Sequence, residues 1–161
     1  MIHGPLRWYE VAERLRAAVH DALTDKPQRS GVVPGAIAWD ECDCGLLAVS
    51  VGPIVWSDEF PDEATTRTAN CNPVYEAAEI IVQVARCAPS PQGQDMAPTV
   101  AALDAAAQAV ARDAYETRCA VLTALVGMVD EDIRDYFLRP QTPQGPAGGC
   151  VGTELRVSVA L

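Results

Sequence analysis

Cysteine is the residue type in this sequence with the most chemical potential, because thiolates are strong zinc ligands. The six cysteines lie at positions 42, 44, 71, 87, 119 and 150. Cys42 and Cys44 are two residues apart, so on a strand their side chains would point to the same side. If the strands form a meander, Cys87 would lie at the same edge of the sheet as Cys42. Cys150 is a fourth candidate, whereas Cys71 would lie about 40 Å away at ~3.3 Å per residue. A metal site at Cys42, Cys44, Cys87 and Cys150 is therefore one alternative.

We nevertheless expect reduced cysteines that bind no metal. The spacing of Cys42 and Cys44 is not the Cys-x-x-Cys of zinc ribbons, and buried cysteines pack well as small apolar side chains. The first ten residues lack the basic start and apolar run of an export signal. The reducing cytosol is then the expected compartment, and it favours free thiols.

Two acidic groups are candidates for binding a divalent cation or for supplying a paired acid and base. They are Asp58, Glu59, Asp62 and Glu63, and Asp130, Glu131 and Asp132. Neither group has the EF-hand pattern, and no surrounding residues indicate a pocket. Runs of like charge are usually solvated surface, and we interpret both groups in this way.

The glycines near the C-terminus superficially resemble a phosphate-binding loop. They are Gly145, Gly148, Gly149 and Gly152. No Lys-Ser/Thr pair follows them, and the next segment predicts a strand instead of the helix that such a loop requires. His20 lies on the polar side of a predicted helix with no Ser or Cys elbow nearby. We therefore expect no catalytic residue and no cofactor.

Composition indicates one folded, acidic domain over residues 1–161. Hydrophobic residues make up 49% and charged residues 21%, and the formal net charge is -10. That charge disfavours sequence-specific binding of nucleic acid. Trp8, Trp39 and Trp56 are interpreted as core or interface anchors, because the basic residues that accompany base stacking are missing. Thr123 and Gly127 interrupt the longest near-apolar stretch, so no membrane segment is expected.

Hydrophobic periodicity predicts two helices and five strands. Residues 5–23 have the three- and four-residue spacing of an amphipathic helix. Residues 25–31 are predicted as a linker, and extended segments are predicted at 36–39, 46–56 and 74–87, with Gly52-Pro53 marking a bulge or an edge. Residues 99–129 predict a long helix with a kink or break near Asp113. Two further strands are predicted at 136–139 and 151–161.

The fold class predicted from this order, α-β-β-β-α-β-β, is α+β. A mainly antiparallel sheet should carry the N-terminal helix and the long central helix on one face. Long loops are expected at residues 57–73 and 139–149. The second loop contains three prolines and three glycines in residues 140–149, so we expect it to dock against a neighbouring subunit and to form no part of the fold.

The chain resembles the tail terminator and tail-completion proteins of long-tailed bacteriophages, particularly those that infect actinobacteria. The resemblance rests on the helix at 5–23 and on four segments. These are VPGAIAWDECDCGLLAV at 33–49, RCAPSP at 86–91, APTVAALD at 97–104 and GGCVGTELRV at 148–157. The cysteine-bearing hairpin is not a general feature of that fold, so no role for its thiols is carried over.

The resemblance implies a structural virion protein with no catalytic residues. Such proteins form hexameric rings that cap the tail tube and join it to the head-to-tail connector. The partners implied are other copies of the chain, the major tail tube protein and the connector or stopper protein, and genome DNA passes through the ring. One alternative is another connector component such as a stopper, which would favour a small barrel. The other is a small cysteine-dependent metal-binding or regulatory domain.

Overall fold

The structure is a computed structural model that describes residues 4–35, 37, 43, 45–64, 75–91, 93 and 96–161. Two helices and six strands follow one another along the chain. They are α1 (Arg7–Ala22), β1 (Arg29–Val33), β2 (Leu46–Ser57), β3 (Tyr75–Cys87), α2 (Val100–Met128), β4 (Asp135–Leu138), β5 (Thr142–Ala147) and β6 (Cys150–Ala160). The predicted order is confirmed, with β5 added between the last two predicted strands.

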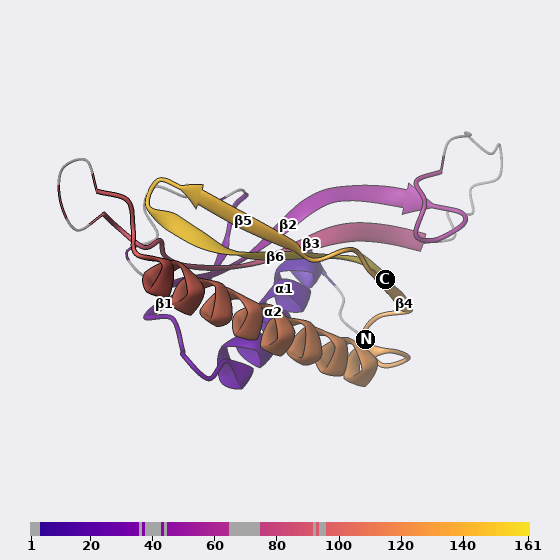
Figure 1. Cartoon of the computed structure of the whole chain (residues 1–161). Helices are drawn as coiled ribbons and strands as arrows, with labels where there is room; N and C mark the ends of the chain where they lie inside the picture. The colour runs from indigo at the N-terminus through magenta and orange to yellow at the C-terminus, as the bar shows by residue number, and fades with distance from the viewer. Residues whose placement is uncertain are drawn as a thin grey trace.

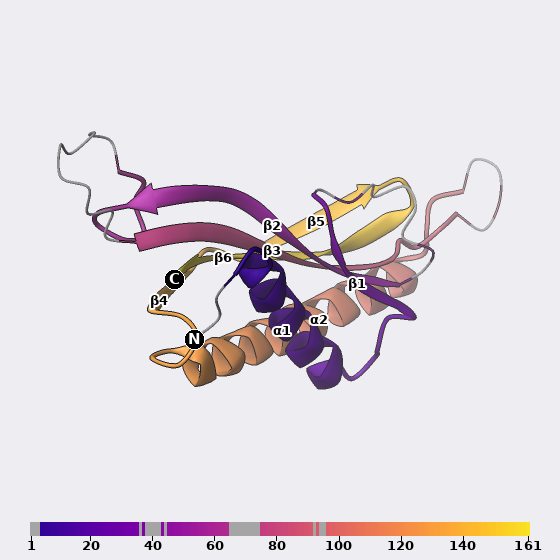
Figure 2. The same cartoon turned by 180° about the vertical axis from the view of Figure 1, so that it is seen from behind.

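The strands form one mixed sheet in the order β1-β2-β3-β6-β4, and β5 also pairs with β6. Both helices cover the same face of this sheet (Figures 1 and 2). The β2–β3, β3–β6, β4–β6 and β5–β6 pairs are antiparallel, and β1–β2 is parallel. The predicted α+β class, with its helices packed on one face, is therefore confirmed.

Alternation along the central strands places aliphatic side chains under the helices. The sheet contributes Leu47, Val49, Ile80, Val82, Val84, Leu155, Val157 and Val159 to the core. Leu15 of α1 and Val121 and Leu125 of α2 meet them from the helix layer. Each such side chain stabilises the fold by ~1.5–3 kcal/mol when it is fully buried, so this interface holds the molecule together.

The α2 helix runs without a break through the position where a kink was predicted. Thr99 begins it, and the Thr99 hydroxyl accepts a hydrogen bond from the Ala102 amide at 3.1 Å. Its 29 residues span about 44 Å at 1.5 Å per residue. Asp113 does not cap a second helix, because it is buried within α2 and binds Arg86 of β3. The prediction of a kink at Asp113 was wrong.

The β1 strand lies where a linker was predicted, and it pairs with β2 in parallel instead of as a hairpin. Parallel neighbours need a connection of about a dozen residues or more, which residues 34–45 supply. Val32 and Val33 favour a strand, and an edge strand tolerates Ser30 and Gly31 because only one side of it is paired. The strand predicted at 36–39 lies outside the described residues except for Ile37, which is in no strand.

The segment predicted as a loop at 139–149 contains strand β5, so this prediction also needs correction. β5 pairs with β6, with a register shift between Gln144 and Ala147. An edge strand can hold Pro143 and Pro146 because it needs amide donors on one side only. Gly145 has a φ of 85°, and a Cβ there would lie 2.4 Å from the Cys150 carbonyl oxygen. The prolines and glycines therefore shape a bulged hairpin.

The bulge expected at Gly52-Pro53 is confirmed, because the β2–β3 register shifts between Val51 and Ile54. Beyond the bulge the two strands continue to Ser57 and back from Tyr75. Residues 58–64 follow as a turn with a short bridge between Glu59 and Asp62. The rest of the predicted loop at 57–73 lies outside the described residues.

Candidate assembly surfaces

The first candidate surface is the β2–β3 arm, defined as residues 54–64 together with residues 75–78. At this end β2 and β3 curve away from the helix layer (Figure 1). Ile54 and Trp56 are 53% and 55% exposed. Their cross-strand partners are Ala78, which lies in the core under the helices, and Glu76, which binds α1. Since directly paired residues share a face, Ile54 and Trp56 lie on the helix side of the sheet, at the level of the first turn of α1.

The base of the arm is tied to the first turn of α1. Arg7 donates to Glu76 from Nε at 3.1 Å and from a terminal nitrogen at 2.5 Å, and the Trp8 indole donates at 2.7 Å. The Arg7 hydrogen bond, helped by Trp8, lowers the pKa of the Glu76 carboxyl. Arg134 stacks over the Tyr75 ring at 5.3 Å. These contacts fix the direction in which the arm leaves the body.

The acidic residues of the arm are exposed, in line with their interpretation as solvated surface. They are Asp58, Glu59, Asp62 and Glu63. Ser57 donates to the Asp62 carbonyl at 2.5 Å, and the Asp62 amide donates to the Glu59 carbonyl at 2.9 Å. The turn therefore presents its carboxylates to solvent on a folded backbone.

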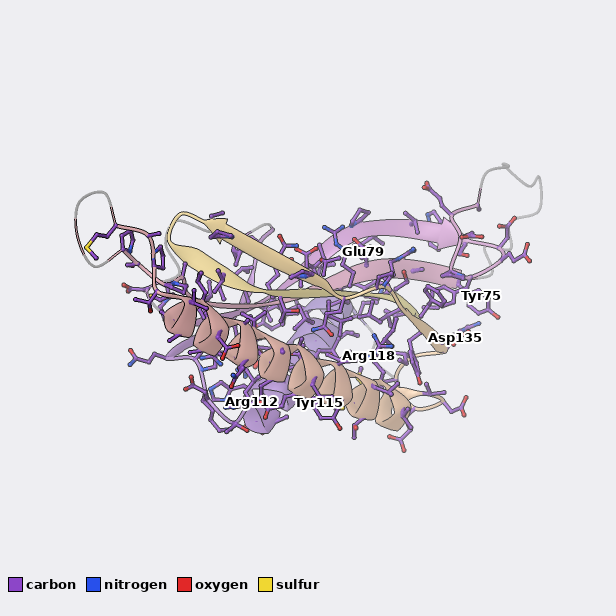
Figure 3. The ribbon with its side chains drawn as sticks, in the orientation of Figure 1. Tyr75, Glu79, Arg112, Tyr115, Arg118 and Asp135 are labelled. Carbon is purple, nitrogen blue, oxygen red and sulfur yellow. The ribbon has the colours of Figure 1, made fainter. Side chains whose placement is uncertain are left out.

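The second candidate surface is the α2 outer face, defined as Arg112, Tyr115, Arg118, Cys119, Leu122 and Val126. All six residues are exposed, and Figure 3 labels Arg112, Tyr115 and Arg118 along the length of the helix. Tyr115 is 71% and Val126 59% exposed. The opposite side of α2 carries Asp113, Thr117, Ala120, Val121, Leu125 and Met128, which are buried. Sequence analysis missed this face, although the spacing of Arg112, Tyr115 and Arg118 was a usable signal.

A polar cluster ties α2 to β3 and to the segment after α1. The Arg86 guanidinium binds Asp113 at 2.8 and 2.9 Å, and it lies 3.3 Å from Asp25. Glu116 accepts from the Thr24 amide at 2.8 Å and from its hydroxyl at 2.5 Å. These two hydrogen bonds lower the pKa of Glu116, so one face of α2 is fixed to the body while the other remains exposed.

A third candidate surface is the groove between the first half of α2 and the β5–β6 hairpin. It has a volume of about 710 Å³ and no charged side chain in its lining. Leu103, Ala107 and Val110 line it from the helix, and Pro143 and Pro146 line it from β5. The segment expected to dock against a neighbour therefore forms one wall of an apolar groove.

The sheet face opposite the helices carries a polar network. Glu154 accepts from Gln83 and Arg156, both at 2.7 Å. Arg156 also donates to Glu79 at 3.2 Å, and Arg139 lies 3.6 Å from the same carboxylate. Opposite charges are matched within this group, so the described side chains satisfy one another and leave no net charge for a ligand.

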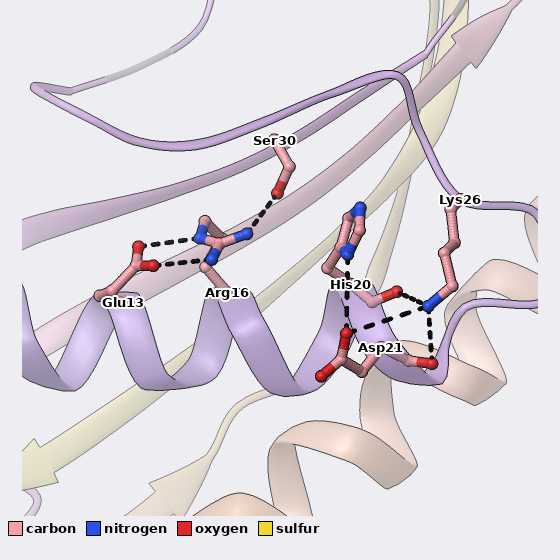
Figure 4. A network of polar contacts seen from close by, with 6 residues as sticks. All are labelled: Glu13, Arg16, His20, Asp21, Lys26 and Ser30. Carbon is pink, nitrogen blue, oxygen red and sulfur yellow. Dashed lines mark hydrogen bonds and ion pairs between the residues drawn. The ribbon is translucent and has the colours of Figure 1, made fainter.

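The surface of α1 carries a second set of local pairs (Figure 4). Arg16 binds Glu13 at 2.7 and 2.8 Å and donates to Ser30 of β1 at 3.0 Å. Near the end of α1, Lys26 donates to the carbonyls of His20 and Asp21 at 2.8 and 3.0 Å. A cation at these carbonyls stabilises the helix C-terminus. Helix capping thus explains why Lys26 lies next to His20 and Asp21.

The cysteine prediction needs correction at two positions. Cys87 and Cys150 each take part in a disulfide bond, and Cys119 is the free cysteine of the described residues. The expectation of reduced thiols rested on the expected compartment and took no account of where the cysteines lie in the fold. A disulfide sulfur is not a thiolate ligand, which removes two members of the alternative metal site. Cys42 and Cys44 lie outside the described residues.

The remaining candidates form no reactive cluster within the described part of the chain. Groups of three or more metal-ligating side chains are absent from these residues. The glycine-rich segment leads into strand β6, as expected. Gly152 lies within that strand, where a Cβ would be 2.1 Å from the Val84 carbonyl oxygen, so close strand packing explains it. Across the described residues, neither helix has the length and apolar character required to cross a bilayer.

Comparisons with known proteins find a likeness in structure. No family model and no curated protein matches the sequence. Among solved structures, the chain is similar to the sheath/tube terminator of the extracellular contractile injection system PVC, determined by cryo-EM in the extended state. The sequence identity is 11% and the TM-score 0.34, and the alignment covers 100% of this chain. It covers 58% of the other, so this chain corresponds to little more than half of that protein's length.

Proposed function

We propose that the protein is a structural subunit of a bacteriophage tail, a tail terminator built from one domain over residues 1–161. Copies of the chain form a ring, expected to be a hexamer, that caps the tail tube and joins it to the head-to-tail connector in the virion. The observation that carries this proposal is the β2–β3 arm, which leaves the body of the subunit and exposes Ile54 and Trp56.

An exposed aromatic side chain next to an aliphatic one on a rigid strand is suited to contact with another protein. The acidic turn at the end of the arm and the net charge of -10 suit a ring through which DNA passes without being retained. The partners proposed are further copies of the chain, the major tail tube protein and the connector or stopper protein. The role is structural and not enzymatic.

The sheet also bears on the alternatives. A stopper was expected to favour a small barrel, whereas this sheet is open and is covered by helices on one face. The metal-binding alternative loses Cys87 and Cys150 as ligands. The described residues therefore support the terminator more directly than either alternative.

The proposal is tested on the purified full-length chain and on assembled tails. Native mass spectrometry should detect a closed oligomer, and electron microscopy of tails mixed with the protein should place density at one end of the tube. A chain that stays monomeric at micromolar concentration and leaves tube ends bare would contradict the proposal. Stoichiometric zinc in elemental analysis would favour the metal-binding alternative.

A further inference from the structure

The arm presents an apolar patch that its own helices do not cover. Ile54 and Trp56 lie on the helix side of the sheet, and Trp56 is directly opposite Glu76, the residue that binds the first turn of α1. About half of each of these two side chains is nevertheless exposed. In the body of the molecule this side of the sheet is packed against helices. The patch therefore has the surface character of a sheet from which a covering helix is missing.

The α2 outer face is the opposite case, a helix surface that no sheet covers. Tyr115, Leu122 and Val126 give it apolar area. Arg112 and Arg118 are the exposed charged residues of α2 from position 105 onward, and no hydrogen bond or ion pair joins Arg118 to another described residue. Asp113 is buried against Arg86. Glu116 lies one turn from Arg112, and the charge of Arg112 helps to lower the pKa of its carboxyl, so Glu116 partly offsets Arg112 and leaves Arg118 as the unmatched cation of this face.

Charge decides which of these surfaces can meet. The arm has four exposed carboxylates within residues 58–63 and no basic residue there, whereas the exposed charged residues of the α2 outer face are Arg112 and Arg118. Two arms brought together would place carboxylates against carboxylates, and two outer faces would place arginines against arginines. Like charges across an interface disfavour the wrong pairing, so contact between unlike surfaces is favoured over contact between like ones.

We propose that the arm of one copy lies on the α2 outer face of the next copy, with Trp56 packed beside Tyr115 and Leu122. Arg112 and Arg118 of the second copy then face the acidic turn of the first. The contact supplies the missing helix layer under the arm. It joins two different surfaces, so every copy keeps one of each for another neighbour, and a chain of such contacts closes into a ring if the rotation permits. This inference rests on the proposed ring.

The dimensions of the two surfaces agree. Ile54 and Trp56 are about 7 Å apart along the strand at ~3.3 Å per residue. Tyr115 and Leu122 are about 10 Å apart along the helix, and Arg112 lies about one turn before Tyr115. A two-residue apolar patch that ends in an acidic turn can therefore lie across an apolar stretch flanked by arginines.

The test uses one variant for each surface of the full-length chain. Trp56→Thr removes the aromatic side chain that makes the contact and places a β-branched residue in the strand. The double variant Arg112→Glu/Arg118→Glu reverses the charge of the α2 outer face. In sedimentation velocity each should weaken self-association by about thirtyfold or more, as loss of a central contact does. Phe137→Thr is the matched control, because Phe137 is an exposed aromatic on strand β4, and it should assemble like the parent.

Mixing the two variants shows whether the arm binds the α2 outer face or whether each surface binds its own kind. Each variant keeps one intact surface, so an equimolar mixture should give heterodimers that do not grow further. Combining Arg112→Glu/Arg118→Glu with Asp58→Arg/Glu59→Arg in one chain should restore assembly. A variant that remains a stable two-fold dimer, or a mixture that stays monomeric, would overturn the arm-to-helix contact.

Failure of this inference and failure of the proposed function give different results. If the parent chain forms a ring and both surface variants form the same ring with unchanged affinity, the arm contact is wrong and the ring remains. If the parent chain does not self-associate, the ring and the contact both fail. Thermal unfolding of each variant, unchanged from the parent, confirms that the folded subunit was measured.

Discussion

The helix-covered part of the sheet and the β2–β3 arm belong to the same two strands, yet different forces hold them. In the covered part, Val49 and Val82 pack against the helices and are fully buried. In the arm, the strands keep their ladder, but Ile54 and Trp56 face solvent and one polar cluster around Glu76 anchors them. The covered part is thus complete within one subunit, whereas the arm has the character of a surface that another molecule completes.

The largest effect on stability is expected from the covered part. Leu155→Ala removes a fully buried side chain beneath the helices and should lower the free energy of unfolding by about 3 kcal/mol, through lost burial and the cavity it leaves. Urea denaturation followed by circular dichroism measures it. Ile54→Ala is the matched arm variant and should change the value by less than about 0.5 kcal/mol. Equal losses at the two sites would remove the distinction between the regions.

The next effect concerns the cluster that fixes α2 to the sheet. Asp113→Ala removes the buried carboxylate that accepts two hydrogen bonds from the largely buried Arg86 guanidinium, while the contact of Arg86 with Asp25 remains. We expect a loss of about 2–3 kcal/mol, because hydrogen bonds between charged groups in a buried site contribute more than exposed ones. The double variant Arg86→Ala/Asp113→Ala should lose less than the sum of the single variants. Additive losses in a double-mutant cycle would show that the two residues act separately.

Reduction of the disulfides should destabilise the body of the subunit. Cys87 and Cys150 lie at the end of the β3–β6 ladder remote from the arm, so dithiothreitol should lower the free energy of unfolding by about 2 kcal/mol. The denaturation midpoint with and without reductant measures the effect. Trp56 fluorescence in a Trp8→Phe/Trp39→Phe background should stay the same before unfolding. A midpoint insensitive to reductant would assign these bonds no role in stability.

Acid should weaken the anchor of the arm. The pKa of Glu76 is lowered in the folded state from a reference of 4.5, so its contribution is present above that pH and is lost as the pH falls through the folded-state value. Stability should therefore decline with acid less steeply in Glu76→Gln than in the parent. Denaturation series at pH 7, 5, 4 and 3 compare them. Identical pH profiles would mean that the Arg7 contact contributes nothing measurable.

The smallest effect on stability is expected in the arm, at Trp56. Trp56→Thr should leave the free energy of unfolding of the isolated subunit within about 0.5 kcal/mol of the parent value, because about half of the Trp56 side chain is already in water. Chemical denaturation at a concentration below the assembly threshold measures it. A loss as large as that of Leu155→Ala would place Trp56 in the core and contradict its role as a contact residue.

Sequence patterns were enough to predict the features that depend on neighbouring residues, namely helix α1 and the bulge in β2. The periodic apolar residues of α1 include Val11, Leu15 and Val19, and all three are buried. The bulge at Gly52-Pro53 follows from the missing amide of proline. The prediction of a kink at Asp113 failed because Asp113 binds Arg86 of strand β3, and sequence spacing does not show such a contact.

The errors in the sheet and in the candidate site have the same physical origin. The edge strands β1 and β5 are paired on one side and therefore tolerate Gly31, Pro143 and Pro146, which sequence patterns assign to linkers and loops. The disulfide bonds of Cys87 and Cys150 depend on which cysteines the fold brings together, and the sequence alone does not show this. The outer face of α2 was missed because exposure depends on which side of the helix the sheet covers.

The two prolines of β5 have a consequence for the protein before assembly. An unpaired sheet edge offers amide donors and carbonyl acceptors to any other extended chain, and long exposed edges promote aggregation. Pro143 and Pro146 remove two donors from a six-residue strand, and the bulge at Gly145 interrupts its register with β6. A further strand cannot add here with a regular ladder. Subunits can therefore accumulate at high concentration without joining their sheets at this edge.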